Sequence, residues 1–309
     1  MGDLMHALPA LTDAKQSIDN VSFDWVVDKA FASVPQWHPS VDKIITTDHR
    51  NWKKHLFSKA SRSSFNRVKT EISNTQYDVV LDMQNNLKSA FLSYTCNQNV
   101  IGMDSKSSRE YPAHWAYSST VSVEKNQHAI DRQKKLLAFA LGYETSKSRV
   151  DYGVDKRKFV KPNIDIPTNY TVLVQNASWT TKQWSIKNWQ NLIGYLDRLK
   201  ITMFFPSGND EEFARASEIA SVSNAAIALE PLPLDQIAYL IDHARYSVCS
   251  DTGLAHLSAL VDTPSLTLYG PTNTKLIGTA GTSQRHIVGI EGDINNITVE
   301  EVIRKLPVY

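Results

Sequence analysis

The stretch at residues 250–256, Ser-Asp-Thr-Gly-Leu-Ala-His, constrains the fold of this chain more than any other. A short apolar β run precedes it at 246–249, a mostly apolar helical pattern follows to residue 261, and a second apolar run occupies 266–269. The Asp-Thr pair is typical of a helix start, and the glycine permits close approach of backbone or of a ligand. This order of strand, tight turn, helix and strand indicates a parallel α/β sheet.

The helix predicted to begin near Thr252 is also a candidate anion site. A helix start at the carboxyl end of a parallel strand offers unpaired N–H groups and the positive end of the helix dipole, which suits a phosphate group. His256 lies close enough to the helix start to reach a ligand there. The plainer interpretation is an ordinary capped helix with a core or surface histidine, and the local pattern leaves both interpretations open.

Composition and charge narrow the class of protein. The 309 residues, 42% of them hydrophobic and 21% charged, suffice for two globular domains. A formal net charge of +1 gives no reason to expect a nucleic-acid partner. Cys96 and Cys249 have no metal-ligand spacing, which favours a reduced, cytoplasmic compartment. No apolar run approaches the roughly 18 residues of a membrane span.

The first half of the chain alternates strand and helix patterns. We expect strands at 23–27, 44–46 and 77–82 and helices at 31–34 and 127–141, the last with Ile130, Leu137 and Leu141 buried. A polar loop, 83–89, follows the strand at 77–82. Its turn lies at Asn85-Asn86, and asparagine tolerates the left-handed backbone that such a turn requires.

Residues 49–70 form a basic segment without an acidic residue. Trp52, Leu56, Phe57 and Phe65 are interleaved with its cations, Arg50, Lys53, Lys54, Lys59, Arg62, Arg67 and Lys69. One interpretation is a solvated helix face. The other is a surface for a phosphorylated, anionic acceptor at a membrane.

The second half repeats the alternation after an irregular linker at 154–169. Strands are predicted at 170–174, 201–205 and 225–229, and helices at 189–199, 210–220, 234–244 and 297–306. The sequence therefore predicts two α/β domains, residues 1–155 and 156–309.

Several motifs together resemble glycosyltransferase family 9, the bacterial heptosyltransferases that build the inner core of lipopolysaccharide. The motif at 250–256, followed by Tyr-Gly-Pro-Thr at 269–272, is similar to the nucleotide-sugar motif of that family. Further similarity runs over nearly the whole chain, at residues 1–3, 8–11, 23–27, 128–129 and 182–184. The resemblance implies a GT-B fold, in which two Rossmann-like domains face a cleft. Residues 1–155 would bind the acceptor and residues 156–309 the nucleotide sugar, with the C-terminal helix able to pack back on the first domain.

The start of the chain departs from the family pattern. Relatives have an apolar strand directly before Met-Gly-Asp, whereas here Met1-Gly2-Asp3 opens into a helical pattern. We therefore expect the first domain to lack its first strand. A start assigned at an internal methionine is the interpretation we favour, because loss of a central strand leaves the ladder bonds of its neighbours unpaired.

The resemblance also implies an activity. It is inverting transfer of L-glycero-D-manno-heptose from ADP-heptose to Kdo-lipid A, at the cytoplasmic face of the inner membrane. No cofactor or divalent metal is expected, since HExxH, paired cysteines and Asp-x-Asp are absent from the sequence. Three alternatives remain: addition of a later core heptose, epimerisation of a sugar nucleotide on the same fold, and an inactive homologue.

The resemblance assigns roles position by position. Asp3 is the expected catalytic base, although a helix N-cap is the competing role for it. Lys182 is expected to neutralise the donor phosphate. The donor site would consist of Ser178, Glu212, Asp251, Thr252, Gly253 and His256. For the acceptor site, the candidates come from the residues themselves: Arg50, Lys53 and Lys54 of the basic segment, and Gln84 of the polar loop at a strand's carboxyl end.

Overall fold

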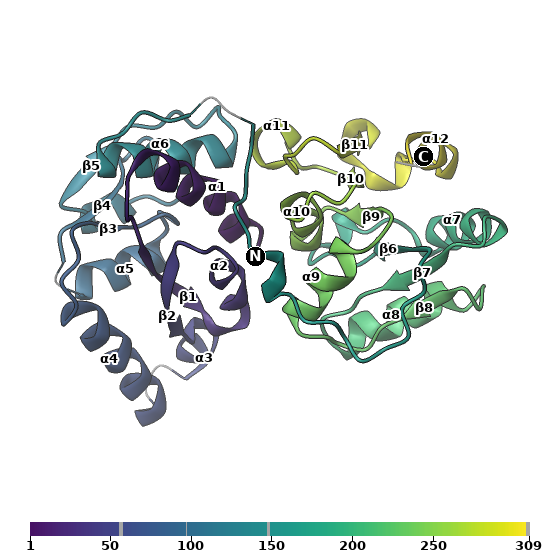
Figure 1. Cartoon of the computed structure of the whole chain (residues 1–309), viewed down its shortest axis with the longest axis horizontal. Helices are drawn as coiled ribbons and strands as arrows, with labels where there is room; N and C mark the ends of the chain where they lie inside the picture. Colours follow the sequence, from purple (N-terminus) through teal and green to yellow (C-terminus); the bar gives the residue numbers. More distant parts are fainter. Residues whose placement is uncertain (56–57, 97, 147–148, 307–309) are drawn as a thin grey trace. The chain divides into compact units, whose positions relative to one another are not determined.

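The chain forms two compact units, one of residues 3–153 and one that begins at Val154 (Figure 1). A computed structural model describes residues 1–55, 58–96, 98–146 and 149–306, apart from the side chains of Arg50, Asn51 and Lys53. Both units alternate parallel strands with helices, as the sequence predicts. No helix in the described ranges is long and apolar enough to cross a membrane.

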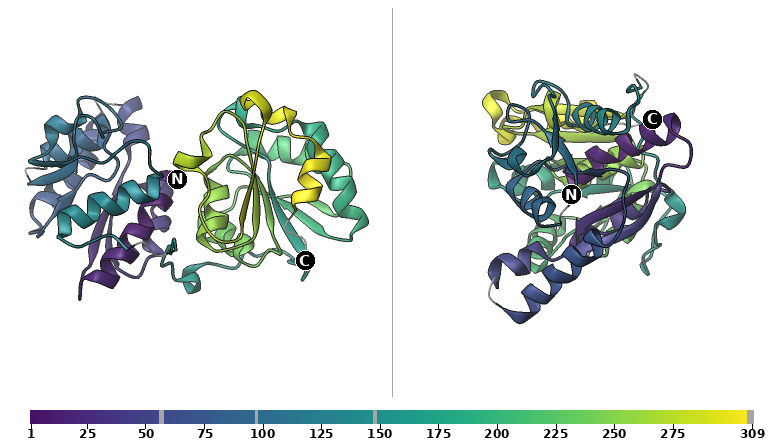
Figure 2. Two further views of the ribbon diagram at one scale, coloured as in Figure 1. Left: turned by 90° about the horizontal axis from the view of Figure 1, so that it is seen from above. Right: turned by 90° about the vertical axis from the view of Figure 1, so that its left-hand side faces the viewer.

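The second unit contains one continuous parallel sheet of six strands. Its spatial order is β11-β10-β9-β6-β7-β8, and helices cover both of its faces (Figure 2). The strands are β6 Tyr170–Val174, β7 Thr202–Phe205, β8 Ala226–Ala228, β9 Ser247–Ser250, β10 Ser265–Tyr269 and β11 Gln284–Val288. The predicted strands at 170–174, 201–205 and 225–229 are confirmed. Strand β7 begins one residue later than predicted, and β8 is one residue shorter at each end.

The helices of the second unit begin at polar caps. They are α7 Ile186–Arg198, α8 Asp210–Ala220, α9 Leu234–Asp242, α10 Gly253–Leu260, α11 Thr274–Ile277 and α12 Val299–Lys305, with short 3-10 turns η3 Lys156–Lys158, η4 Thr180–Lys182, η5 Ile290–Gly292 and η6 Ile294–Asn296. Helix α7 starts three residues before the predicted Trp189. The Ser185 side chain accepts a hydrogen bond from the Asn188 N–H, and this cap precedes the first buried residue of the helix.

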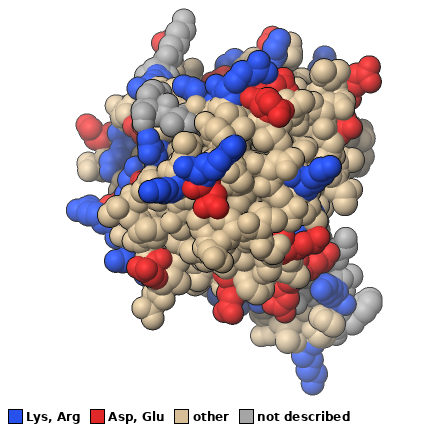
Figure 3. All heavy atoms as spheres, turned by 90° about the vertical axis from the view of Figure 1, so that its right-hand side faces the viewer, with Lys and Arg blue, Asp and Glu red and all other residues tan. Residues whose placement is uncertain are grey.

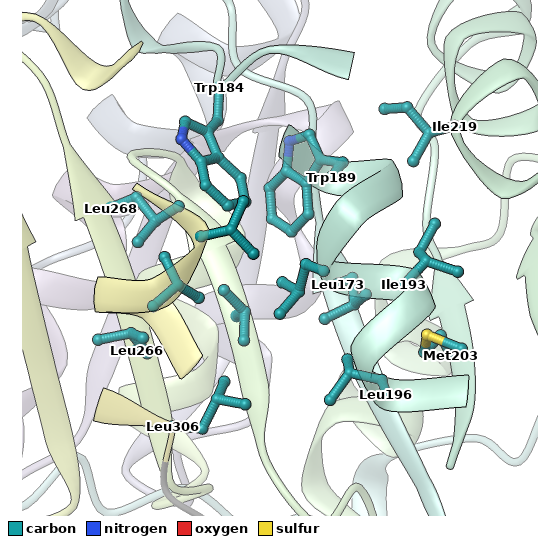
Figure 4. Packing of buried hydrophobic residues seen from close by; sticks show 14 of the residues in the cluster. Leu173, Trp184, Trp189, Ile193, Leu196, Met203, Ile219, Leu266, Leu268 and Leu306 are labelled. Carbon is teal, nitrogen blue, oxygen red and sulfur yellow. The ribbon is translucent and has the colours of Figure 1, made fainter. Parts of the chain in front are cut away.

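A single apolar core joins this sheet to the helices on one of its faces (Figure 4). Trp184 and Trp189 pack edge to face with ring centroids 5.2 Å apart, and the Trp184 indole N–H donates to the Ile297 carbonyl at 2.9 Å. Leu306, at the end of α12, is buried in the same core. The apolar face of the C-terminal helix is therefore used within the core of the second unit.

The first unit contains two separate parallel sheets. One pairs β1 Phe23–Asp28 with β2 Val41–Thr47, and the other has the order β3 Val80–Leu81, β4 Val100–Met103, β5 Ser119–Val121. The predicted strand at 77–82 is thus reduced to two residues, because only 80–81 have a ladder partner in β4. Phe23 of one sheet and Leu81 of the other pack into the same apolar cluster.

Helices of the first unit supply that cluster and the rest of the core. They are α1 Gly2–Ser17, α2 Ser33–Gln36, α3 His49–Lys54, α4 Lys59–Ser73, α5 Leu87–Thr95 and α6 Ala129–Leu141, with the turns η1 Lys29–Phe31 and η2 Ala113–Ala116. The shared cluster is built on Ala10 and Ala14 of α1 and Leu137 of α6. The prediction that the chain opens directly into a helix is confirmed by α1.

Candidate functional site

The carboxyl edge of the six-stranded sheet has the geometry of a ligand site. From β6 the chain continues to β7 and β8 on one side, and it then returns to β9, β10 and β11 on the other. In parallel α/β sheets, ligands bind outside the strand ends where the strand order reverses in this way. The loops after β6 and β9 carry the predicted residues Lys182 and Asp251 to this position.

Lys182 and Asp251 form an ion pair at the strand-order reversal. The Lys182 Nζ lies 2.7 Å from Asp251 Oδ2, with 23% of the lysine side chain and 7% of the aspartate side chain exposed. The Thr272 hydroxyl donates to the same carboxylate oxygen. A nearly buried carboxylate needs such partners, because an unpaired buried charge is strongly destabilising. The pair therefore places one positive and one negative group in a largely desolvated position beside a helix start.

That helix, α10, begins at Gly253 with Thr252 as its N-cap. The Thr252 hydroxyl accepts a hydrogen bond from the Leu254 N–H at 3.4 Å, as the prediction of a helix start at the Asp-Thr pair requires. His256 lies in the first turns of the same helix and is buried. The predicted residues 251–256 are thus collected at one helix terminus, where N–H groups and the dipole favour an anion.

The loop that leads from β6 toward Lys182 is tied to the start of α8. The Asn176 side-chain amide donates to the Glu212 carbonyl at 3.3 Å, and the Gln183 amide donates to the Ala177 carbonyl at 2.8 Å. The Glu212 carboxylate accepts a hydrogen bond from the Gly208 N–H at 2.8 Å, so this side chain also has a local structural role. Ser178, in the same loop, is exposed.

Gly270 brings the loop after β10 against the turn that carries Lys182. A Cβ atom at this glycine would lie 2.7 Å from the Thr181 carbonyl oxygen, a distance that real Cβ atoms essentially never show. Any larger residue would push the two loops apart. The glycine of the Tyr-Gly-Pro-Thr motif therefore allows Thr272 to reach the carboxylate of Asp251.

Asp3 lies in the first unit, in the first turn of α1. The competing prediction that Asp3 is the N-cap is wrong, since Met1 occupies that position. Instead, Arg109 Nη1 lies 2.5 Å from Asp3 Oδ2, and 55% of the aspartate side chain is exposed. Burial acts to raise the pKa of Asp3, but the charge and hydrogen bond of Arg109 outweigh it and hold the pKa below its ordinary value. Asp3 is therefore an ionised carboxylate at neutral pH, as a proton acceptor must be.

Gln84 projects from a turn organised by Asp82. One oxygen of this buried carboxylate accepts hydrogen bonds from the N–H groups of Gln84 and Asn85, both at 2.9 Å, and the other accepts from the Tyr117 hydroxyl at 2.7 Å. Burial raises the pKa of Asp82. Asn85 has a φ of 51°, which confirms the predicted left-handed turn. The Arg109 N–H donates to the Asn85 carbonyl at 3.1 Å, so Gln84 and the partner of Asp3 belong to one local assembly.

The basic segment forms α3 and α4, and at least one of its described cations, Arg67, has an acidic partner. Glu71 follows directly after the segment. Its carboxylate oxygens lie 3.7 Å from Arg67 Nη1 and 2.7 Å from Lys43 Nζ. Lys54 is exposed at the end of α3. Arg50 and Lys53 belong to α3, and their side chains lie outside the described part of the structure. No described contact joins Lys54 to the Gln84 turn.

Thr272 and Arg109 are among the residues of these assemblies that were not predicted. Thr272 belongs to the motif at 269–272, but its bond to Asp251 has no signature in the sequence. Arg109 has no signal at all, since its partner Asp3 lies 106 residues away. Within the described ranges, no group of three or more His, Cys, Asp and Glu side chains is arranged to hold a metal ion.

Comparison with known proteins identifies the family. The family model described as glycosyltransferase family 9 (heptosyltransferase) matches residues 65–305. The chain is 36% identical to lipopolysaccharide heptosyltransferase 1 of Salmonella typhimurium over 310 aligned residues, which cover 99% of this chain and 96% of the relative. The solved structure of the Escherichia coli heptosyltransferase WaaC with ADP matches with a TM-score of 0.91 and 33% identity, over 98% of this chain and 95% of WaaC.

A second structure of WaaC was solved with ADP-2-deoxy-2-fluoro heptose. It matches with a TM-score of 0.88 and 32% identity, again over 98% of this chain and 95% of that protein. These matches confirm the predicted GT-B class of the fold. The chain is therefore a member of glycosyltransferase family 9, the heptosyltransferase family.

Proposed function

We propose that this protein transfers L-glycero-D-manno-heptose from ADP-heptose to Kdo-lipid A, the first heptose addition of the lipopolysaccharide inner core. The Salmonella relative is named lipopolysaccharide heptosyltransferase 1, and the matched WaaC structures were solved with ADP and with a fluorinated ADP-heptose. The observation that carries the proposal is the Lys182–Asp251 pair, held by Thr272 at the strand-order reversal beside the start of α10. A cation and a helix terminus suit the diphosphate of a nucleotide sugar, and a carboxylate can accept hydrogen bonds from its sugar hydroxyls.

On the donor side, the second unit supplies the electrostatics. Lys182 and the N–H groups of Thr252 and Gly253 stabilise the diphosphate as it leaves. Asp251 accepts hydrogen bonds from heptose hydroxyls, and the remaining donor-side residues, Ser178, Glu212 and His256, hold the nucleotide and orient the sugar. The acceptor oxygen forms a bond to the anomeric carbon of heptose while the bond from that carbon to the diphosphate oxygen breaks. ADP is released, and the anomeric configuration inverts.

On the acceptor side, the first unit supplies the base. The proton of the attacking hydroxyl passes to the carboxylate of Asp3, which Arg109 keeps ionised before the reaction. Arg50, Lys53, Lys54 and Gln84 bind the anionic acceptor. No divalent metal is required, because Lys182 and the helix terminus stabilise the departing charge. The acceptor is a lipid, so the proposed location is peripheral, at the cytoplasmic face of the inner membrane.

The test is product analysis with defined acceptors. The purified chain is incubated with ADP-heptose and Kdo-lipid A in detergent micelles, with EDTA present, and the lipid is analysed by mass spectrometry. We expect a gain of one heptose per acceptor together with release of ADP. An acceptor that already carries the first heptose is the matched control, and we expect it to gain none.

Other results would support the alternatives. Extension of the heptosylated acceptor alone would identify a later core transferase. An isomerised free sugar nucleotide, with neither acceptor extended, would identify an epimerase. Activity that requires an added metal would contradict the proposed role of Lys182 as the sole cation at the diphosphate.

A further inference from the structure

Helix α5 and the neighbouring segment at η2 in the first unit expose five large apolar side chains. Leu87, Phe91 and Tyr94 share one face of α5, and Tyr111 and Trp115 lie at and just before η2, with exposed fractions between 48% and 73%. We call these five residues the aromatic face. Helices α5 and η2 pack side by side, and the Leu87 N–H donates to Glu110, the neighbour of Tyr111, at 2.9 Å. Single exposed apolar residues are ordinary, but a group on adjacent helices marks an interaction surface.

The core of the first unit does not use this face. The opposite side of α5 and its C-cap bury Leu92 and Cys96 in a core cluster, so the helix is already anchored. The rings of the aromatic face are held by one another and by α4. Phe91 stacks on Phe65 with centroids 5.8 Å apart, and Tyr111 meets Trp115 edge to face, also at 5.8 Å. These ring contacts fix the positions of the aromatic side chains, while a large part of each ring stays exposed to solvent.

The surroundings of the aromatic face are mostly basic, and their exposed acidic residue beside Tyr111, Glu110, accepts the hydrogen bond from the Leu87 N–H. Lys88 is exposed on α5, which has no acidic residue, and Lys59, Arg62 and Lys69 are exposed on α4. The acidic residue of α4, Glu71, is engaged by Lys43 and Arg67. On the face that Figure 3 shows, on the side of α7 and α8 in Figure 1, acidic and basic side chains are instead interspersed.

We propose that the aromatic face, with the exposed cations of α4 and α5, docks the protein onto an anionic membrane surface. Trp and Tyr rings have an apolar body and a polar tip and favour the headgroup level of a bilayer, while Lys and Arg are attracted to anionic lipids. A second copy of the chain fits less well, because two such faces would set like charges against each other. The inference rests on the proposed function in one respect: the acceptor is a lipid, and this surface brings the unit that carries Asp3 to it.

The test measures vesicle binding in the absence of donor and acceptor. Sedimentation compares vesicles of phosphatidylethanolamine and phosphatidylglycerol with vesicles of phosphatidylcholine alone. The test variant is Tyr94→Ser with Trp115→Ser, and the matched control is Phe139→Ser with Ile290→Ser, which removes two apolar residues that are also exposed, by 51% and 71%. We expect the parent and the control to bind anionic vesicles in a salt-dependent manner. We expect the vesicle affinity of the test variant to be lower than that of the parent by a factor of about ten or more. The circular dichroism spectrum and the thermal unfolding midpoint of each variant check that the first unit is folded.

Three results would overturn the docking surface. The first is equal vesicle binding by the test variant and the parent. The second is a parent that transfers heptose in detergent micelles but does not bind anionic vesicles, in which case the proposed function survives alone. The third is a parent dimer, seen by sedimentation velocity, that the test variant converts to a monomer, since the face is then a protein interface. A chain that transfers no heptose but whose vesicle binding depends on the aromatic face would support the proposed docking surface and contradict the proposed function.

Discussion

The central strands of the second unit are buried far more deeply than strands β1 and β3 of the first. Every residue of β6, β9 and β10 is buried, whereas five of the six residues of β1 and both residues of β3 are only partly buried. Strands β6, β9 and β10 each have a ladder partner on both sides, while β1 pairs with β2 alone and β3 with β4 alone among the described residues. The comparison shows that similar apolar strands reach different burial because burial is set by lateral neighbours as well as by the covering helices.

The candidate site residues of the two units also differ in burial. Asp251 is nearly buried and bonded to Lys182 and Thr272, so its position is determined by packing. Asp3 is half exposed and has Arg109 as its ionic partner. A buried network resists displacement, whereas an exposed carboxylate can titrate and exchange partners. The second unit is thus suited to hold a ligand, and the first to offer a reactive carboxylate.

The largest effect is expected at Asp3. We predict that Asp3→Asn lowers kcat by about 10²- to 10⁴-fold, the usual cost of losing a general base, with little change in donor affinity. Turnover at saturating ADP-heptose and calorimetric donor binding measure the two quantities separately. Equal turnover by the variant and its parent, in a preparation that is active, would remove Asp3 from the mechanism.

Two leucine variants test the difference between the sheets directly. Leu173 in β6 is fully buried, and Leu173→Ala should lower the local free energy of unfolding by about 2–5 kcal/mol. Leu81 in β3 is only partly buried, so Leu81→Ala should cost about half as much or less. Hydrogen exchange measured by mass spectrometry reports each segment separately. Similar losses at both positions would show that the partial exposure of β3 has no energetic consequence.

The buried network of the second unit predicts a graded loss of donor affinity. Asp251→Ala removes charge-assisted hydrogen bonds and should weaken ADP-heptose binding by about 1.5–3 kcal/mol. Thr272→Val removes one hydroxyl that donates to the same carboxylate and should cost about 0.5–1.5 kcal/mol. Isothermal titration calorimetry measures both. Unchanged affinity in a well-folded Asp251→Ala variant would rule out its role in donor binding.

The smallest expected effect is on the pH dependence of kcat, which Asp3 of the first unit controls in the proposed mechanism. Arg109 lowers the pKa of Asp3, so Arg109→Ala should raise that pKa toward its ordinary value. The catalytic form is the deprotonated carboxylate, and the acid limb of the kcat profile should therefore move to higher pH. The pH profile of the parent is the reference. A shift toward lower pH, or an unmoved limb with Asp3 still required for turnover, would contradict the assigned partnership.

Much of the fold could be predicted where short-range signals are strong. The bounds of β6 and α8 match the predicted ranges, and Asn85 adopts the predicted left-handed turn. The strand at 77–82 was predicted too long, because apolar character continues beyond the residues that find a ladder partner. Helix α5 was not predicted as an element, although its capping box at Asn86 and Ser89 was a usable signal.

The alternation of strands and helices and the helix start at Thr252 could be predicted from local patterns, because apolar periodicity and capping act over a few residues. The family could be predicted from the motifs at 250–256 and 269–272. Tertiary structure decided which distant groups meet. The bond from Thr272 to Asp251 follows from the order of strands at the carboxyl edge, and the pairing of Asp3 with Arg109 spans 106 residues. It also decided that one apolar side of α5 is buried and the other exposed, since a helical pattern shows where apolar faces lie but not which neighbour covers them.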